Sequence, residues 1–129
     1  MSLLRLETTP ASKGVQRVIL GGRLDTHTYG QLDEVLAPIL ADNSVFSLVL
    51  DLAGLDYISS AGIRSVFKAR KALAARAGKV LVVNPQPQIQ KVFDMVKAVP
   101  LNEIFTSVEE ADAYLYAMQR KLIEGDSDD

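Results

Sequence analysis

Two adjacent serines, Ser59 and Ser60, are the residues whose types and spacing most clearly suggest chemistry. They follow an apolar stretch and precede residues with helical spacing, so either hydroxyl can cap a helix start. Backbone N–H groups and the positive end of the helix dipole favour an anion there, so a serine phosphate of about −1.5 to −2 charge would be stabilised. Gly62 would leave the approach open, and Arg64, one turn after Ser60, could pair with the phosphate. The alternative is a plain helix cap followed by a glycine kept for close packing.

The residue types present do not favour metal, thiol, cofactor or enzymatic chemistry. The chain has no cysteine and one histidine, His27, so disulfides, thiol nucleophiles and histidine-paired metal sites are excluded. No stretch matches a Walker loop or a dinucleotide fingerprint, and we expect neither cofactor nor metal. Ser60 lacks a histidine or lysine at a motif spacing that would activate it, and only folding could bring Asp25 and His27 to it. We therefore do not expect an enzyme.

Composition and charge indicate one ordinary globular domain. The 129 residues are 48% hydrophobic and 23% charged, and this length is enough to bury a core. The formal net charge of −2 gives no basic excess that would favour nucleic acid. Residues 124–129 are acidic and offer nothing apolar to bury, so we expect a mobile tail. No signal peptide and no apolar run near the ~20 residues of a membrane span is present, which favours a cytoplasmic protein without membrane insertion.

The first half of the pattern predicts a hairpin and a helix. Alternating residues indicate strands at 4–8 and 15–20, with Gly21-Gly22 ending the second. Apolar residues at helical spacing then predict a helix over residues 28–42. Pro38 lies inside that helix and should kink or shorten it.

The middle of the chain predicts a strand, helix, strand unit. Residues 45–52 and 80–83 are nearly continuous apolar runs and indicate parallel strands covered on both faces. A turn at Ala53-Gly54 should follow the first of these strands. Residues 63–77 form one helical stripe between them, with Gly78 placed as a helix stop, and the crossover should be right-handed.

The last third predicts two more helices. One passes through residues 89–96 and ends before Pro100, and Ile104-Phe105 could add a short edge strand. Ser107 matches a capping box that opens a final helix over residues 108–122. The order β-β-α-β-α-β-α-(β)-α therefore predicts a single α/β domain over residues 3–123, with a mixed sheet of four to five strands and about four helices.

Residues 51–64, which include Tyr57-Ile-Ser-Ser-Ala-Gly-Ile-Arg64, resemble the signature of the STAS domain. This module occurs in bacterial anti-sigma factor antagonists and in sulfate transporter tails. Gly22-Arg-Leu-Asp25, residues 78–84 and residues 92–96 resemble further elements of the family in the same order. The resemblance covers essentially residues 3–120 and implies a STAS fold.

The resemblance also implies an anti-sigma factor antagonist that works by partner switching. Ser60 stands at the family's phosphorylated serine, two residues before the glycine, with Ser59 as a competing acceptor and Asp25 as the acidic residue beside the switch. The unphosphorylated form would bind an anti-sigma factor that is a GHKL-type serine kinase and so free a sigma factor. Phosphorylation would abolish binding until a serine phosphatase reverses it. The implied partner-binding residues are Asp25, Tyr57, Ile58, Ser59, Ser60, Ala61, Gly62, Ile63 and Arg64.

The physics of such a switch is straightforward. Uncharged Ser60 would lie in an apolar contact patch near Asp25, and a phosphate there would oppose docking by desolvation and repulsion. Two other functions stay open: a scaffold subunit of a lipid-transport or stressosome-like assembly, or a nucleotide-binding module that uses Asp25 and the helix start at Ser59. The oligomeric state also stays open, between a monomer and a weak dimer.

Overall fold

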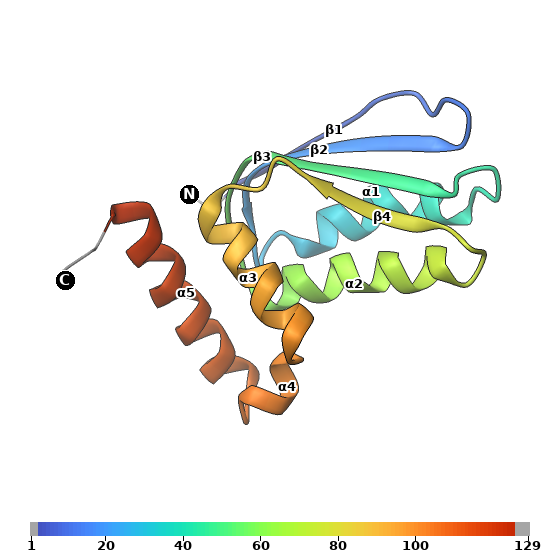
Figure 1. The fold of residues 1–129 in the computed structure, drawn as a ribbon. Coiled ribbons are helices and arrows are strands. Elements are labelled where there is room, and N and C mark those ends of the chain that lie inside the picture. Colours follow the sequence, from blue (N-terminus) through green and yellow to red (C-terminus); the bar gives the residue numbers. More distant parts are fainter. Residues whose placement is uncertain (1–2, 126–129) are drawn as a thin grey trace.

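A mixed sheet of four strands in the order β1-β2-β3-β4 forms the centre of the domain (Figure 1). The structure is a computed structural model that describes residues 3–125. Strand β1 (Leu4–Thr8) pairs antiparallel with β2 (Val15–Leu24). Strand β3 (Ser47–Ile58) runs parallel to β2, and β4 (Lys79–Val83) runs parallel to β3. The predicted hairpin and the parallel pairing of the two apolar strands are therefore confirmed.

In the described part of the chain, five helices complete the domain. They are α1 (Tyr29–Ala41), α2 (Ser60–Ala74), α3 (Pro87–Ala98), α4 (Leu101–Ile104) and α5 (Val108–Glu124). Helices α1 and α2 connect the parallel strands and pack against each other on one face of the sheet (Figure 1). The predicted class, one α/β domain with a mixed sheet, is confirmed. Helix α4 replaces the edge strand predicted at Ile104-Phe105, because this segment continues from α3 at a distance from β4 (Figure 1).

The helices on that face bury alternate residues of the two central strands. Val18 in β2 and Leu48 in β3 are fully buried. The opposite face carries an ion pair between Arg17 and Asp51, which spans β2 and β3. Leu81 of the edge strand β4 is 41% exposed. The prediction that both apolar strands are covered on two faces is therefore wrong for β4, since a short apolar run does not reveal whether its strand lies at an edge.

Strands β2 and β3 extend beyond their predicted ends. Gly21 and Gly22 lie inside β2 where its register with β3 shifts, and β3 continues through Ala53-Gly54 without a turn. Gly22 has a φ of +90°, and a Cβ there would overlap the backbone before β1, so glycine permits a bulge here. The two strands remain paired as far as Leu24 and Ile58, which lie just before the α1 and α2 region.

The helix ends differ from expectation in detail. Helix α1 contains Pro38 and ends three residues later at Ala41. After α2, Ala77 and not Gly78 adopts the left-handed conformation, with a φ of +62°. Gly78 is needed for another reason: a Cβ there would lie 2.6 Å from the backbone oxygen of Phe46. The helix thus ends before Gly78 as predicted, but the left-handed residue after it is Ala77.

The C-terminal helix begins with the predicted cap. Ser107 Oγ accepts a hydrogen bond from Glu110 N, whereas the Glu110 carboxylate accepts from Thr106 N instead of closing on Ser107. Glu124, assigned above to the acidic tail, is the last residue of α5, and residues 126–129 of that tail lie outside the described residues. Within residues 3–125, no helix has the length and apolar character needed to cross a membrane.

Gly62, in the first turn of α2, lies directly against the ends of the central strands. A Cβ at this position would lie 2.8 Å from Leu24 Cγ and 2.9 Å from Ile58 Cγ1. Both neighbours are fully or almost fully buried and have little room to move. The missing side chain thus lets α2 approach the sheet, which is the close-packing alternative considered above.

We predict that Gly62→Ala lowers the free energy of unfolding by about 1–3 kcal/mol, because the added methyl group overpacks this contact. Chemical denaturation of the two proteins measures the difference. Gly30→Ala is the matched control: Gly30 lies in the first turn of α1 with no atom within 4 Å of an added Cβ. That substitution should be neutral or stabilising by up to about 1 kcal/mol. Unchanged stability of Gly62→Ala would contradict the packing argument.

Candidate functional site

The two serines perform different roles at the start of α2. Ser59 is the N-cap, with extended backbone, and its Oγ accepts a 3.4 Å hydrogen bond from Gly62 N. Its own N–H donates to Leu24 O at 2.9 Å, so Ser59 joins the helix start to the end of β2. The sequence allowed either serine to cap, and the structure assigns the cap to Ser59.

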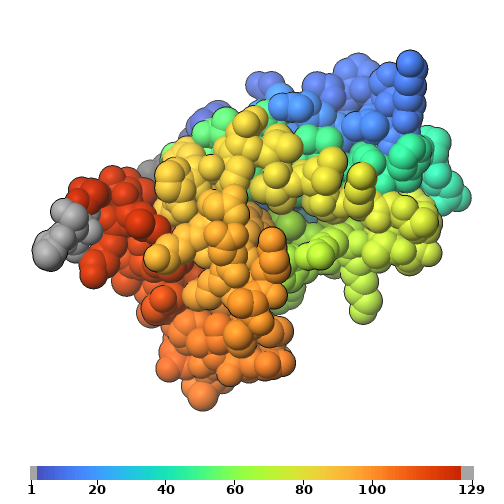
Figure 2. All heavy atoms as spheres, in the orientation of Figure 1, coloured from blue at the N-terminus to red at the C-terminus, as the bar shows by residue number. Residues whose placement is uncertain are grey.

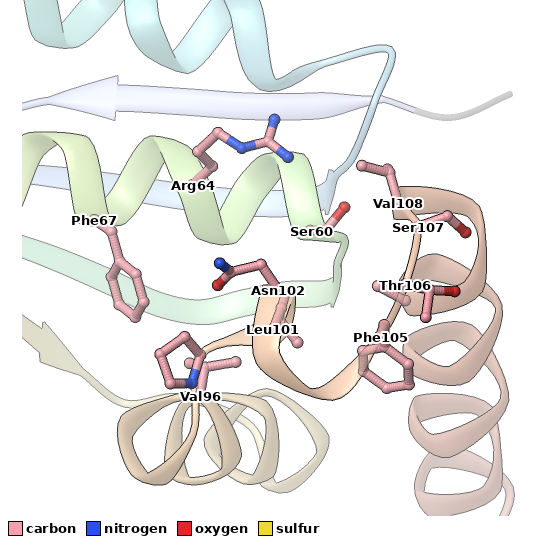
Figure 3. A pocket seen from close by; sticks show the side chains of 12 residues that line it. Ser60, Arg64, Phe67, Val96, Leu101, Asn102, Phe105, Thr106, Ser107 and Val108 are labelled. Carbon is pink, nitrogen blue, oxygen red and sulfur yellow. The ribbon is translucent and has the colours of Figure 1, made fainter.

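Ser60 leaves its hydroxyl unused. The residue is 5% exposed, and its buried Oγ has no hydrogen-bond partner among the described residues. Its backbone N–H is satisfied from α5, since it donates to Asp112 Oδ1 at 2.9 Å. In Figure 3 the Ser60 side chain lies opposite Val108 and Ser107, at the start of α5. The serine that the sequence singled out is thus buried, with a free hydroxyl and a carboxylate close to its backbone.

Helix α5 also binds the end of β3 through Gln119. This side chain is fully buried, and its amide makes two hydrogen bonds to the backbone of Ile58: Oε1 accepts from Ile58 N at 3.1 Å, and Nε2 donates to Ile58 O at 2.8 Å. Leu115, whose backbone oxygen also accepts a hydrogen bond from Gln119 Nε2, and Ala111 are buried as well. Helix α5 therefore covers residues 57–60, which we call the switch segment.

A charged cluster adjoins Tyr57 of the switch segment. The Arg23 guanidinium lies 4.3 Å from the centroid of the Tyr57 ring and 3.5 Å from Asp25 Oδ2. Asp25 Oδ1 accepts hydrogen bonds from His27 N and Thr28 Oγ1, which hold the loop before α1. The Asp25 carboxylate is thus held in place close to Tyr57.

The Tyr57 phenol is correspondingly hard to ionise. Burial, reinforced by the negative charges of Asp112 and Asp25, raises the pKa of Tyr57 to about 12, while Arg23 acts in the opposite direction. Tyr116 of α5 completes the environment, with its ring 6.0 Å from the Tyr57 ring in an edge-to-face arrangement. Carboxylates from two separate parts of the chain therefore act on one buried residue of the switch segment.

A cavity of about 460 Å³ opens next to Ser60, between α2, α4 and the start of α5 (Figure 3). Its lining is mainly apolar and includes Phe67, Leu101 and Phe105. Ser60 and Arg64 line it from α2, and Arg64 is exposed. Ser60 thus lies in the wall of the cavity, although its Oγ atom is itself buried.

The remaining predicted contact residues do not form an open surface in this structure. Ile58, Ala61 and Ile63 are all buried, and Gly62 faces the strands. The residues of the expected apolar patch around Ser60 are therefore buried. Helix α5 covers Ile58 and Ser60, and Ile63 belongs to the hydrophobic core. His27 is an exposed loop residue. Within residues 3–125, no group of acidic or histidine side chains is placed to hold a metal ion.

Sequence reasoning missed the α5 residues that complete this site. Asp112, Tyr116 and Gln119 look like ordinary polar or partly polar positions of an amphipathic helix. Their partners lie 52 residues away for Asp112 and 61 residues away for Gln119. Only the fully buried glutamine has an unusual environment, and no local sequence pattern indicates it.

The raised pKa of Tyr57 predicts a specific pH dependence. The phenol has a pKa near 10.0 in an unfolded chain and about 12 in the folded one, so the folded state holds the proton more tightly. The stability that the protonated Tyr57 phenol gives to the folded state is fully present below pH 10. It is lost as the pH rises from 10 towards 12. The difference in absorbance at 295 nm between the protein and Tyr57→Phe, recorded by fast pH jumps before unfolding, should titrate near pH 12. A midpoint near 10 would contradict the buried environment.

Comparison with known proteins agrees with this architecture. The sequence profile of the STAS domain matches residues 8–111. The chain is 31% identical over 74 residues to the anti-sigma F factor antagonist of Lysinibacillus sphaericus, covering 57% of this chain and 63%, less than two thirds, of that relative. It is 32% identical over 100 residues to BtrV of Bordetella bronchiseptica, which is named as an anti-sigma factor antagonist. That match covers 78% of this chain and 85% of the relative.

The fold resembles that of the anti-sigma factor antagonist SpoIIAA of Bacillus. The unphosphorylated and phosphorylated forms of that protein align with TM-scores of 0.62 and 0.61 at 23% sequence identity, over 70% of this chain and 82% of SpoIIAA. This likeness concerns the fold, and the match of the profile over residues 8–111 concerns the family. The chain belongs to the STAS domain family.

Proposed function

We propose that this protein is an anti-sigma factor antagonist in which phosphorylation of Ser60 is the switch. The observation that supports it most is the difference between the two serines: Ser59 Oγ is used as the helix cap, and Ser60 Oγ has no partner among the described residues. A phosphate on Ser59 would break the cap, whereas Ser60 can be modified without loss of a hydrogen bond from its side chain. Relatives named as anti-sigma factor antagonists support the same function.

The switching reaction would be a phosphoryl transfer catalysed by the partner. The anti-sigma factor, a GHKL-type kinase, transfers the γ-phosphoryl group of ATP to Ser60 Oγ, forming the O–P bond and releasing ADP and a proton. A serine phosphatase reverses the change with water and releases inorganic phosphate. In this proposal the chain itself is the substrate and a binding regulator, not an enzyme.

Charge would give the two forms different affinities. In this proposal the unphosphorylated protein would contact the anti-sigma factor through Asp25, Tyr57, Ser60 and Arg64 and the apolar residues between them. Arg64 is exposed in this structure, and the other three are buried. A phosphate of about −1.5 to −2 charge on Ser60 adds to the carboxylates of Asp25 and Asp112 and must lose water on docking. A difference of about 1–3 kcal/mol in binding, or 5- to 150-fold, is enough for a switch.

The remaining parts of the proposal follow from this role. The binding domain comprises residues 3–123 and acts in the bacterial cytoplasm, where transcription takes place. Because Asp112 already accepts the hydrogen bond of Ser60 N, the α2 start is less open to a nucleotide phosphate. That contact weighs against the nucleotide-binding alternative.

Substitutions at the two serines test the proposal. We predict that Ser60→Asp weakens binding to the anti-sigma factor by 5- to 150-fold, because it places a carboxylate near two others, whereas Ser60→Ala retains binding and blocks phosphorylation. Isothermal titration calorimetry measures affinity, and peptide mass spectrometry after incubation with the kinase and ATP locates the phosphate.

Ser59→Ala is the control for position. It should still accept a phosphate on Ser60, although loss of the cap lowers stability by about 1 kcal/mol. Equal affinities of Ser60→Asp and Ser60→Ala, or a phosphate found on Ser59 in the unmodified sequence, would refute the assignment of the switch to Ser60.

A further inference from the structure

The buried state of Ser60 raises a problem of access. A kinase must reach Oγ, yet that atom is buried and α5 covers the switch segment. We propose that α5 is an autoinhibitory lid that closes over Ser60 and opens before the hydroxyl is modified or the switch segment meets a partner. The lid rests on the proposed function, because it concerns access of the kinase and the partner to Ser60. The experiment that tests the lid needs neither the kinase nor the partner.

Helix α5 is less buried than α2, the helix whose start it covers. Only Ala111, Leu115 and Gln119 of its 17 residues are buried, whereas eight of the 15 residues of α2 are buried. Several of its large apolar side chains are outside the core, with Val108 and Ile123 50% and 53% exposed. Figure 2 shows α5 along one side of the molecule next to α3, with much of its surface facing outward. Elements with few buried contacts open at low free-energy cost.

The bonds that hold α5 are directed at the switch segment itself. Gln119 pairs with both backbone groups of Ile58, and Asp112 accepts from Ser60 N. When α5 leaves, these three backbone groups become available at the edge where β3 ends. The lid therefore occupies hydrogen-bonding groups that a partner could use, and its closure competes with docking.

A phosphate on Ser60 is incompatible with the closed lid. Asp112 Oδ1 lies 2.9 Å from Ser60 N, which is the same donor that a phosphate at the helix start would use. A phosphate on Ser60 would compete with the Asp112 carboxylate for this donor, and the two anions would repel each other. The Asp25 carboxylate beside Tyr57 would add to the repulsion. Phosphorylation would thus expel α5, and a closed α5 would protect Ser60 from phosphorylation.

A thiol probe measures lid opening directly. The chain contains no cysteine, so Ser60→Cys introduces a single thiol, and its side-chain position loses no hydrogen bond. Ser65→Cys is the matched control thiol: Ser65 is 3% exposed on the same helix but does not line the cavity beside α5. The rate of reaction with a small disulfide reagent at fixed pH reports how often each position is exposed.

We expect the Ser60→Cys thiol to react more slowly than a free thiol but faster than the Ser65→Cys thiol. Adding Asp112→Ala should raise the Ser60→Cys rate about fivefold, the factor for loss of one hydrogen bond, and Gln119→Ala should raise it more. Glu109→Ala removes an exposed carboxylate from the same helix and should leave the rate unchanged. Neither lid variant should change the Ser65→Cys rate.

Three results would overturn the lid. The first is an equal increase of both thiol rates in the lid variants, which would indicate opening of the whole domain. The second is a Ser60→Cys thiol that reacts as fast as a free thiol, which would indicate that nothing covers it. The third is a Ser60→Cys rate that neither Asp112→Ala nor Gln119→Ala changes. The thiol experiment uses no kinase, so it tests the lid independently of the proposed function. If the thiol rates confirm the lid but the kinase places no phosphate on Ser60, only the proposed function is rejected. A phosphorylated Ser60 with any of the three results would reject the lid alone.

Discussion

Pairing of β2 with β3 as far as their last residues is the interaction on which the site depends. It places Leu24 beside Ile58, and Ser59 N then donates to Leu24 O, so the chain turns into α2 at a fixed point. Gly62 packs against the same two side chains and sets the distance between α2 and the sheet. Buried packing and backbone hydrogen bonds therefore determine the orientation of the start of α2. They also determine where the side chains of Ser59 and Ser60 lie.

The distribution of donors at that helix start explains why two neighbouring serines differ. Gly62 N is satisfied by Ser59 Oγ and Ser60 N by Asp112, which leaves the Ser60 hydroxyl without a structural task. A group free of structural bonds can be modified without breaking the fold. The same arrangement places the Asp112 carboxylate close to the backbone of Ser60, so a charge added to Ser60 would change the local energy strongly. In the proposed function, stability and switching would thus involve different atoms of one short segment.

Local patterns predicted what depends on neighbours in sequence. The hairpin, the helices and the Ser107 cap follow from periodicity and capping residues. The prediction of Ser60 as the phosphorylated residue comes from the resemblance of the Ser-Ser-Ala-Gly block to the STAS signature. Gly22 was misread as a strand end because a glycine at a bulge and one at a strand end look alike in sequence. The cover over Ser60 was missed because Gln119 meets Ile58 across 61 residues, and pairing over such distances leaves no periodic signal. The residues of a candidate site can thus be recognised in a short stretch of sequence, whereas their accessibility depends on contacts with distant parts of the chain.

Mutual exclusion between a charged Ser60 and a docked α5 is the central claim, and the Ile58 amide reports it most directly. This N–H donates to Gln119 Oε1 in the closed structure, so its hydrogen exchange follows the departure of α5. The measurement is NMR-detected exchange of the Ile58 amide in protein with and without phosphoserine at position 60. The account predicts faster exchange at Ile58 in the phosphorylated protein, with the amides of the central strands still protected. Unchanged protection of Ile58 would show that α5 and the phosphate coexist, and would contradict the account.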